Sequence, residues 1–518
     1  SARAAWPPAP TPPAPPAPDA PPTRARCDRH SLILMTSPAT SSIPLDHGQR
    51  WRAFWVCVSV AALTILDLSK VNVALPSIEA AFGAASTQLQ IVVSGYVLMF
   101  GLALVPFGRL GDQRSRRQLF IIGLSLFTIT SIVCALAPTI EILIAGRLLQ
   151  GLAAGIQMPQ VIGTIQQIFT GKERGRAFGL FGATIGIATA FGPTLGGLMI
   201  ALGGAQDGWR WIFWMNVPLC LAVLAGVVFL LPRTRTPTPG RLQLDPIGLV
   251  LFGVMIVTLM WPFLFTTGSP DDDPRRWWSL VVFVVFAAAF VWWERRYAAS
   301  GKAPLIPFAL FTIASYRNGT LIATTYFTAI PALFLLTTLF LQLGVGLEPV
   351  FAGMVSIGFA LASAVSAWYG GNLVGRLGRP LVVWGLGIVL VSVVVLTVVA
   401  YTVPAGVVAS AMAGVMFVAG IGAGLVVAPN QTLTLAEIPT RSGGLAGSVG
   451  QLGQRIGTAV GTAVALSLFY AAIYRDKGAG RAGLDVYHDA YAFGMISVAL
   501  FVALAFLLGV IDLASRRR

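Results

Sequence analysis

Charged residues are scarce in this chain: Asp, Glu, Lys and Arg make up 11% of its 518 residues, whereas 56% are hydrophobic. Soluble globular proteins contain about 25% charged and about 45–50% apolar residues, so the composition excludes an ordinary soluble enzyme. A net charge of +15 could indicate a nucleic-acid-binding protein, but the basic residues are spread among apolar runs instead of forming a basic surface. The sequence therefore favours a membrane protein with no nucleic-acid partner.

Cysteine, histidine and common catalytic motifs are scarce or missing. The four cysteines form no Cys-x-x-Cys pair, and the three histidines lie outside the long apolar runs, which disfavours a disulfide framework or a zinc site. The sequence contains no Gly-x-x-x-x-Gly-Lys-Ser/Thr, His-Glu-x-x-His or Gly-x-Ser-x-Gly motif. We therefore expect no enzymatic activity, no catalytic residues, no cofactor, no metal and no ATP hydrolysis.

The first 50 residues are rich in Pro, Ala, Ser and Thr. Such a segment cannot bury enough apolar surface to fold, so we expect a disordered tail over residues 1–50. Met35 is an alternative translation start, in which case the preceding Pro-rich stretch would be an upstream extension. The apolar run after Trp51 is too long for a signal peptide and lacks an Ala-x-Ala exit, so no cleavage is predicted.

Fourteen apolar runs follow the tail. At about 1.5 Å per residue, a helix of about 20 residues crosses a hydrocarbon core of about 30 Å. We therefore predict an all-α polytopic membrane protein with 14 transmembrane helices. The predicted spans are 53–75, 91–110, 119–138, 140–163, 177–202, 211–231, 245–266, 279–297, 318–343, 350–373, 380–402, 405–428, 443–473 and 490–513.

Basic residues in the connecting segments indicate the orientation. Placing the N-terminus inside assigns most of these Lys and Arg residues to the cytoplasm, as cytoplasmic loops of membrane proteins prefer. An even number of spans puts the C-terminus on the same side. We expect a multi-pass protein of the cytoplasmic membrane with both termini in the cytoplasm, and we attribute the basic charge to topology.

A short repeat suggests two halves. Gly108-Arg-Leu-Gly111 follows the second run and recurs as Gly375-Arg-Leu-Gly378 after the tenth. Two six-helix repeats alone would place the second copy after the eighth run, so two extra helices must lie between them; parallel six-helix halves occur in transporters. We predict an N-terminal bundle over 51–231, two linker transmembrane helices over 232–310 and a C-terminal bundle over 311–518.

Four stretches in order resemble a known family. Residues 108–117 (GRLGDQRSRR) resemble the loop motif of the major facilitator superfamily, and residues 66–76 (LDLSKVNVALP) resemble the first-helix signature of its fourteen-helix drug:H⁺ antiporter branch, the EmrB/QacA type. Residues 147–151 (RLLQG) and 192–197 (GPTLGG) resemble the fourth-helix motif and the fifth-helix antiporter motif. The resemblance implies the major facilitator fold and proton-coupled efflux of drugs or other small amphiphilic compounds by alternating access.

That resemblance implies small-molecule substrates, protons and the lipid bilayer as partners, with no ATP. Two alternatives stay open. One is an exporter of a specific endogenous metabolite or of an anionic or zwitterionic compound, and the other is a non-transporting membrane sensor with this fold. Since no nucleotide motif is present, the energy must come from an ion gradient; a buried Asp suits protons, and Na⁺ is the alternative.

Asp67 is an ionisable residue deep in the first span. Such residues are costly in a membrane and mark functional pathways, and burial favours the uncharged form, which allows reversible protonation. The resemblance implies a role in proton coupling; the alternative is a structural salt bridge. Lys70 lies on the same helix face, where the family usually has an apolar residue. It either forms a proton-switched pair with Asp67, faces the cavity and favours anionic or zwitterionic substrates, or extends to the outer interface.

Further polar residues complete the predicted cavity. Arg147 and Gln150 lie in the fourth span and Arg455 in the thirteenth, and the first-helix signature adds Asn72. Arg147 is either a counter-charge near the cavity or extends outward to the interface. Arg455 is either a second cationic group in the cavity or the partner of a Glu or a backbone carbonyl of another helix.

Two further groups concern movement. The loop residues Gly108, Asp112, Arg116 and Arg117 are the predicted cytoplasmic gate, whose charges pair between the two halves; the alternative is a loop that only sets topology. The antiporter helix carries the residues Gly192, Pro193, Gly196 and Gly197, which allow close helix approach and loosen the helix at an interface between moving halves. The alternative is ordinary tight packing.

Overall fold

The computed structural model describes residues 46–204, 207–232, 245–266, 272–481 and 483–515. Within these residues 14 helical segments are long and apolar enough to cross a membrane, and each overlaps one of the predicted runs. The described residues contain no strand. The predicted all-α polytopic fold with 14 membrane helices is therefore confirmed, while most of the predicted tail lies outside the described residues.

Seven helices form the first half of the described chain, and the short α6 and α7 together make one span. Their bounds are α1 His47–Phe82, α2 Ser86–Gln113, α3 Arg116–Ala135, α4 Ile140–Ile168, α5 Gly171–Gly203, α6 Gly208–Trp214 and α7 Asn216–Leu230. The next two spans are α8 Pro246–Leu264 and α9 Ser279–Ala299, the latter preceded by a 3₁₀ turn at Pro274–Trp278. They lie in the segment predicted as the linker.

The second half contains the remaining spans. Their bounds are α10 Ala314–Leu339, α11 Pro349–Met354, α12 Ile357–Leu377, α13 Arg379–Thr402, α14 Ala405–Thr434, α15 Gly443–Gly478 and α16 Leu484–Ser515. Short turns at Phe308–Thr312 and Thr440–Ser442 precede α10 and α15, and a π-helical turn at Phe340–Gly344 extends α10.

Local sequence signals explain where α1 begins and ends. Asp46 is its N-cap and forms a capping box with Gln49, so the helix starts at His47, earlier than the predicted bundle boundary. Gly83 ends it with a φ of 60°, a conformation that glycine adopts without steric cost. The helix therefore extends beyond the apolar run at both ends and carries Asp67 in its interior.

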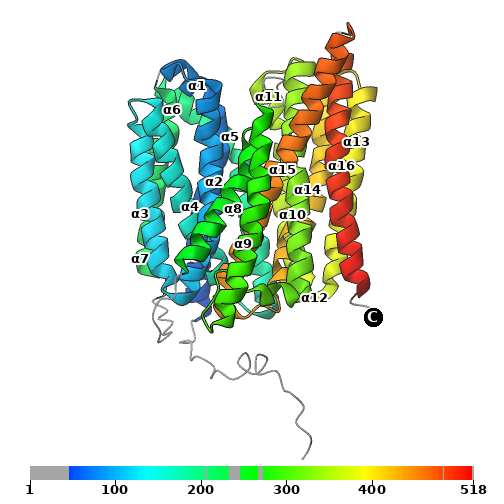
Figure 1. Ribbon diagram of the computed structural model, residues 1–518. Helices are drawn as coiled ribbons and strands as arrows, with labels where there is room; N and C mark the ends of the chain where they lie inside the picture. The colour runs from blue at the N-terminus through cyan, green and yellow to red at the C-terminus, as the bar shows by residue number, and fades with distance from the viewer. Residues whose placement is uncertain (1–45, 205–206, 233–244, 267–271, 482, 516–518) are drawn as a thin grey trace, which may run out of the picture. The chain divides into compact units, whose positions relative to one another are not determined.

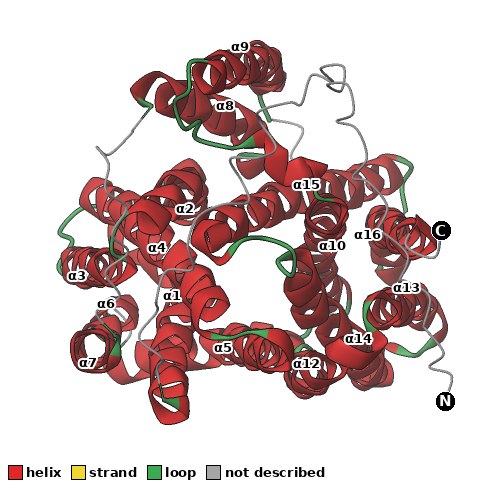
Figure 2. Cartoon of the chain, turned by 90° about the horizontal axis from the view of Figure 1, so that it is seen from below, coloured by secondary structure: helices red, strands yellow, loops and turns green. Residues whose placement is uncertain are grey.

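The two halves repeat the same packing. α1 packs on α5 as α10 packs on α15, and α2 packs on α4 as α12 packs on α14. Across the halves, α5 contacts α12 and α2 contacts α15. α8 and α9 pack on each other and reach the rest through α2 and α15 (Figure 2). This packing supports the proposed division into two six-helix bundles with two linker helices between them.

The first residues of α1 and the last residues of α16 lie at the same end of the helices (Figure 1). We call this the terminal end of the bundles and the other the distal end. α4, which runs toward the terminal end, and α5, which runs away from it, carry the polar and glycine-rich motifs of the first half.

Candidate functional site

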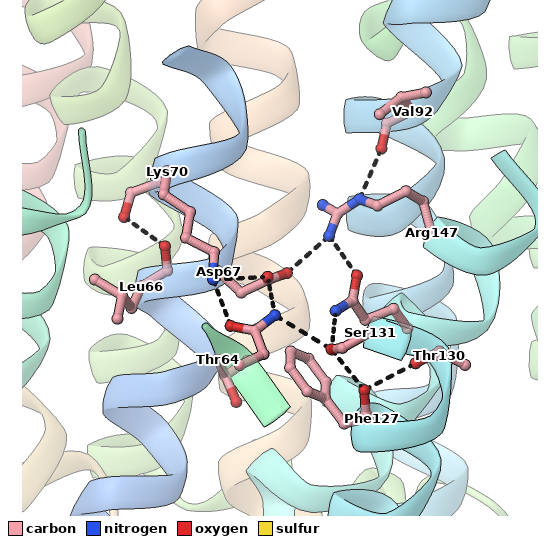
Figure 3. Close-up of polar contacts among 12 residues, drawn as sticks. Thr64, Leu66, Asp67, Lys70, Val92, Phe127, Thr130, Ser131 and Arg147 are labelled. Carbon is pink, nitrogen blue, oxygen red and sulfur yellow. Dashed lines mark hydrogen bonds and ion pairs between the residues drawn. The ribbon is translucent and has the colours of Figure 1, made fainter. Parts of the chain in front are cut away.

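Asp67 is the centre of a fully buried polar cluster in the first bundle (Figure 3). Its Oδ2 forms an ion pair with Arg147 of α4, at 2.7 Å from Nη1. Its Oδ1 accepts a hydrogen bond from Nδ2 of Asn216, the first residue of α7, at 2.7 Å, and lies 3.5 Å from Nζ of Lys70. Three helices thus converge on one carboxylate.

Lys70 points into this cluster. Its side chain has no exposed surface, and its ammonium donates a hydrogen bond to Oδ1 of Asn216. The alternative in which Lys70 extends to the outer interface is therefore wrong. Among the hypotheses for Lys70, this geometry matches the pair with Asp67, and Asn216 bridges the two charged groups.

Arg147 is held by several acceptors. Besides Asp67, its Nη1 donates to Oε1 of Gln150 at 2.7 Å and its Nε to the Val92 carbonyl at 3.2 Å. Gln150 in turn donates to Oγ of Ser131 on α3, at 2.8 Å. The guanidinium carbon lies 4.2 Å from the centre of the Tyr96 ring. With 0% of its surface exposed, Arg147 does not extend to the interface, and that alternative is wrong too.

The cluster carries more positive than negative charge. Lys70 and Arg147 are two cations around the single carboxylate of Asp67, and all three side chains have 0% exposure. Charges removed from water are tolerated only with close partners, and removing one partner of a buried pair costs about 3–5 kcal/mol. Neutralising Asp67 would therefore leave both Lys70 and Arg147 without their counter-charge.

Three members of the cluster were not predicted as site residues. Asn216 and Ser131 supply the bridging hydrogen bonds, and Tyr96 provides the ring beneath Arg147. The sequence could have pointed to Asn216, because an amide side chain within the apolar run 211–231 needs a buried hydrogen-bond partner. Ser131 had none, since a serine in a helix can bond to its own backbone.

The glycines of the antiporter motif lie against α1 beside the cluster. A side chain at Gly192 would overlap the hydroxyl of Ser69, and a Cβ at Gly196 would lie 3.0 Å from both Cβ and the carbonyl oxygen of Lys70. Gly197 differs, because no atom lies within 4 Å of the Cβ it would carry. Gly192 and Gly196 therefore set the approach of α5 to α1 at the charged cluster, and Gly197 does not.

The predicted gate residues lie at the terminal end. Asp112 pairs with Arg116 at 2.6 Å and accepts hydrogen bonds from the backbone nitrogens of Gly444 and Leu445, at 3.1 and 2.8 Å. These amides begin α15, whose dipole favours a carboxylate there. The expectation that charged side chains pair between the halves was wrong for the described residues: the ion pair lies within the first half, and the contacts across the halves join Asp112 to backbone amides and Arg116 to the Thr440 carbonyl at 3.4 Å.

Close glycine contacts join the halves at the same end. A Cβ at Gly108 would overlap the side chain of Ser448 on α15, and one at Gly175 of α5 would lie 2.5 Å from the carbonyl oxygen of Gly371 on α12. The two bundles thus approach each other at the terminal end through positions that tolerate no side chain.

The remaining predicted residues lie outside the cluster. Asn72 and Pro193 are exposed, and Arg117 donates to backbone carbonyls at the end of α7. Arg455 of α15 is partly exposed and lies against Phe100 of α2, with 4.6 Å between the guanidinium carbon and the ring centre. Among the described residues no cluster of three or more His, Cys, Asp and Glu side chains could hold a metal ion.

Comparison with known proteins identifies the architecture. The sequence model of the Major Facilitator Superfamily matches residues 57–462. The chain belongs to this superfamily. It is therefore a membrane transporter and not an enzyme, and its relatives include drug and antibiotic exporters.

Two bacterial transporters and one solved structure are similar to this chain. The transporter is 31% identical to a probable actinorhodin transporter of Streptomyces coelicolor, over 90% of this chain and 82% of the relative. It is 28% identical to the multidrug efflux pump LfrA of Mycolicibacterium smegmatis, with 87% of each chain covered. The crystal structure of the human organic anion transporter MFSD10 superposes with a TM-score of 0.61, covering 89% of this chain and 99% of that one, at 12% identity. At that identity the last similarity shows the fold alone.

Proposed function

We propose that this transporter exports drug-like or antibiotic-like small molecules across the cytoplasmic membrane in exchange for protons, with Asp67 as the group that accepts and releases the proton. The observation that carries the proposal is the buried cluster in which Arg147 and Lys70 both contact the carboxylate of Asp67. A carboxylate at this depth in a transporter marks an ion pathway, and the named exporters among the relatives support efflux.

Electrostatics supplies the coupling. With Asp67 ionised, Arg147 is neutralised and α4 is held to α1 by the 2.7 Å ion pair. When Asp67 binds a proton, the low-dielectric surroundings make the two unpaired cations unfavourable, so conformations that give Lys70 and Arg147 new partners or water become populated. One proton thereby biases the arrangement of α1, α4 and α7.

The conformation described here is closed at the terminal end, where Asp112 accepts hydrogen bonds from the start of α15. Basic connecting segments favour the cytoplasm as the location of this end and of both termini. Opening it must break the bonds of Asp112 and separate Gly175 from Gly371. We assign the gating role to these contacts and the proton-sensing role to the cluster around Asp67.

Everted membrane vesicles test the proposed export. Vesicles carrying the transporter are energised so that the interior is acidic, and uptake of a panel of fluorescent amphiphiles is measured with and without nigericin, which collapses the pH gradient. Uptake that depends on the gradient and on the transporter is expected. A transporter-dependent signal that nigericin leaves unchanged contradicts proton coupling, and no transport of any compound supports the sensor alternative instead.

A further inference from the structure

Arg455 is a cation without a counter-charge inside the bundles. It lies about 18 Å along α15 from the first residue of that helix, at about 1.5 Å per residue. Among the residues that the structure describes, no carboxylate forms an ion pair with it and no oxygen accepts a hydrogen bond from it; its contact is the face of the Phe100 ring at 4.6 Å. Unlike Lys70 and Arg147, it retains some exposed surface.

Near Arg455, the described residues include two further hydrogen-bond donors that have no acceptor. The rings of Phe100 and Tyr96 are neighbours on α2, with 6.1 Å between their centres, and Arg147 lies over the Tyr96 ring at 4.2 Å. Nη2 of Arg147 and the hydroxyl of Tyr96 are buried without a hydrogen-bond partner in the described structure. Each ring of the aromatic pair thus has an arginine against it, and in the described part of the chain no carboxylate pairs with Arg455.

The charges of this region do not balance. Among the described residues, Lys70 and Arg147 both lie against the single carboxylate of Asp67, and Arg455 is a further cation whose neighbour is the Phe100 ring and not a carboxylate. Cations away from bulk water are unfavourable without a counter-charge. An acidic group on a bound molecule would compensate Arg455, and a guanidinium suits a carboxylate because it donates two parallel hydrogen bonds.

We propose that Arg455 binds the acidic group of the transported compound, so that the preferred substrates are organic anions that carry a carboxylate or a phenolate. This inference rests on the proposed export function and specifies its substrate class. One hypothesis from the sequence was that Lys70 favours anionic substrates. We assign that role to Arg455 instead, because Lys70 has no exposed surface and its ammonium already contacts Asp67 and Asn216. The anion would lie where α15 of the second half meets α2 of the first.

Equilibrium binding to the purified full chain in detergent tests this proposal without relying on transport. The probes are two planar xanthene dyes of similar size, the anion fluorescein and the cation rhodamine 123, followed by fluorescence anisotropy. Arg455→Gln removes the cation, Arg455→Lys keeps the charge without the paired donors, and Arg376→Gln removes an exposed charge at the end of α12 as the matched control. Size-exclusion profiles and thermal unfolding establish that each variant is folded.

We expect the unaltered protein and Arg376→Gln to bind fluorescein more tightly than rhodamine 123. Arg455→Gln should weaken fluorescein binding at least tenfold, Arg455→Lys should weaken it less, and neither should weaken rhodamine 123 binding. Preferred binding of the cation, no binding of the anion, or equal affinity of Arg455→Gln for fluorescein overturns the proposal. Asp67→Asn should retain fluorescein binding, so a failure of proton coupling is distinguished from a failure of anion recognition.

Discussion

Lys70 and Asp67 face each other one helical turn apart on α1, with 3.5 Å between Nζ and Oδ1 and no exposed surface on either side chain. Arg147 already supplies an ion pair to the other oxygen of the carboxylate. The second cation is therefore not needed to neutralise Asp67, and Lys70 adds a further positive charge to the surroundings of that carboxylate.

Replacing Lys70 by methionine tests this role. The change removes a buried cation while keeping an unbranched side chain, so the protein should stay folded with the pair of Asp67 and Arg147 intact. Because the carboxylate of Asp67 then loses one of its two neighbouring cations, the pH profile of transport should change. Transport measured in vesicles at fixed gradient and varied pH checks this change, and an unchanged profile would remove Lys70 from the coupling.

Asn216→Ala removes the bridge between the two charged groups. It deprives Asp67 of a 2.7 Å hydrogen bond and Lys70 of its acceptor; a hydrogen bond to a charged group contributes about 1.5–3 kcal/mol. We expect a lower unfolding temperature and reduced transport. Asn216→Asp keeps an acceptor for Lys70 but places a carboxylate oxygen where the amide donated to Asp67, so it is expected to alter the pH profile without restoring stability. Equal stability of Asn216→Ala and the unaltered protein would show that the bridge is dispensable.

Gly196 and Gly197 form a matched pair on α5. A Cβ at Gly196 would lie 3.0 Å from Lys70, whereas one at Gly197 meets no atom within 4 Å. Gly196→Val should force α5 away from α1 at the cluster and reduce transport at least tenfold, while the same substitution at the open position, Gly197→Val, should retain it. Vesicle uptake normalised to the amount of inserted protein measures both. Similar losses in both variants would indicate that helix stability, and not the approach to α1, is the cause.

Variants of Asp112 and Arg117 distinguish contacts of the loop motif across the two halves from contacts within the first half. Asp112→Asn weakens the bonds to the start of α15, worth about 1.5–3 kcal/mol for a charged acceptor, so conformations open at the terminal end should become more populated. Arg117→Gln loses contacts within the first bundle only and should leave this equilibrium unchanged. Maleimide labelling of a cysteine introduced at Ser448, in a background without the native cysteines, reports the opening. Faster labelling in Arg117→Gln than in Asp112→Asn would contradict this division.

The sequence predicts the fold well because 14 runs of apolar residues can hardly form anything but membrane helices. Local motifs also point to Asp67, Arg147 and Gln150, since ionisable and amide groups in such runs need partners. The partners themselves depend on tertiary packing. Asn216 reaches Asp67 because α7 packs against α1 and α3, and no local pattern places Arg455 against Phe100 of the other half.

The most direct test of the central claim compares proton movement with substrate exchange in proteoliposomes containing the unaltered transporter or Asp67→Asn. A pH-sensitive dye inside the liposomes follows protons, and counterflow of a transported fluorescent compound follows exchange without a gradient. Substrate should drive proton movement in the unaltered protein, and Asp67→Asn should abolish proton movement while exchange continues. Substrate-driven proton movement of equal size in both proteins would contradict the assignment of Asp67 as the proton-carrying group.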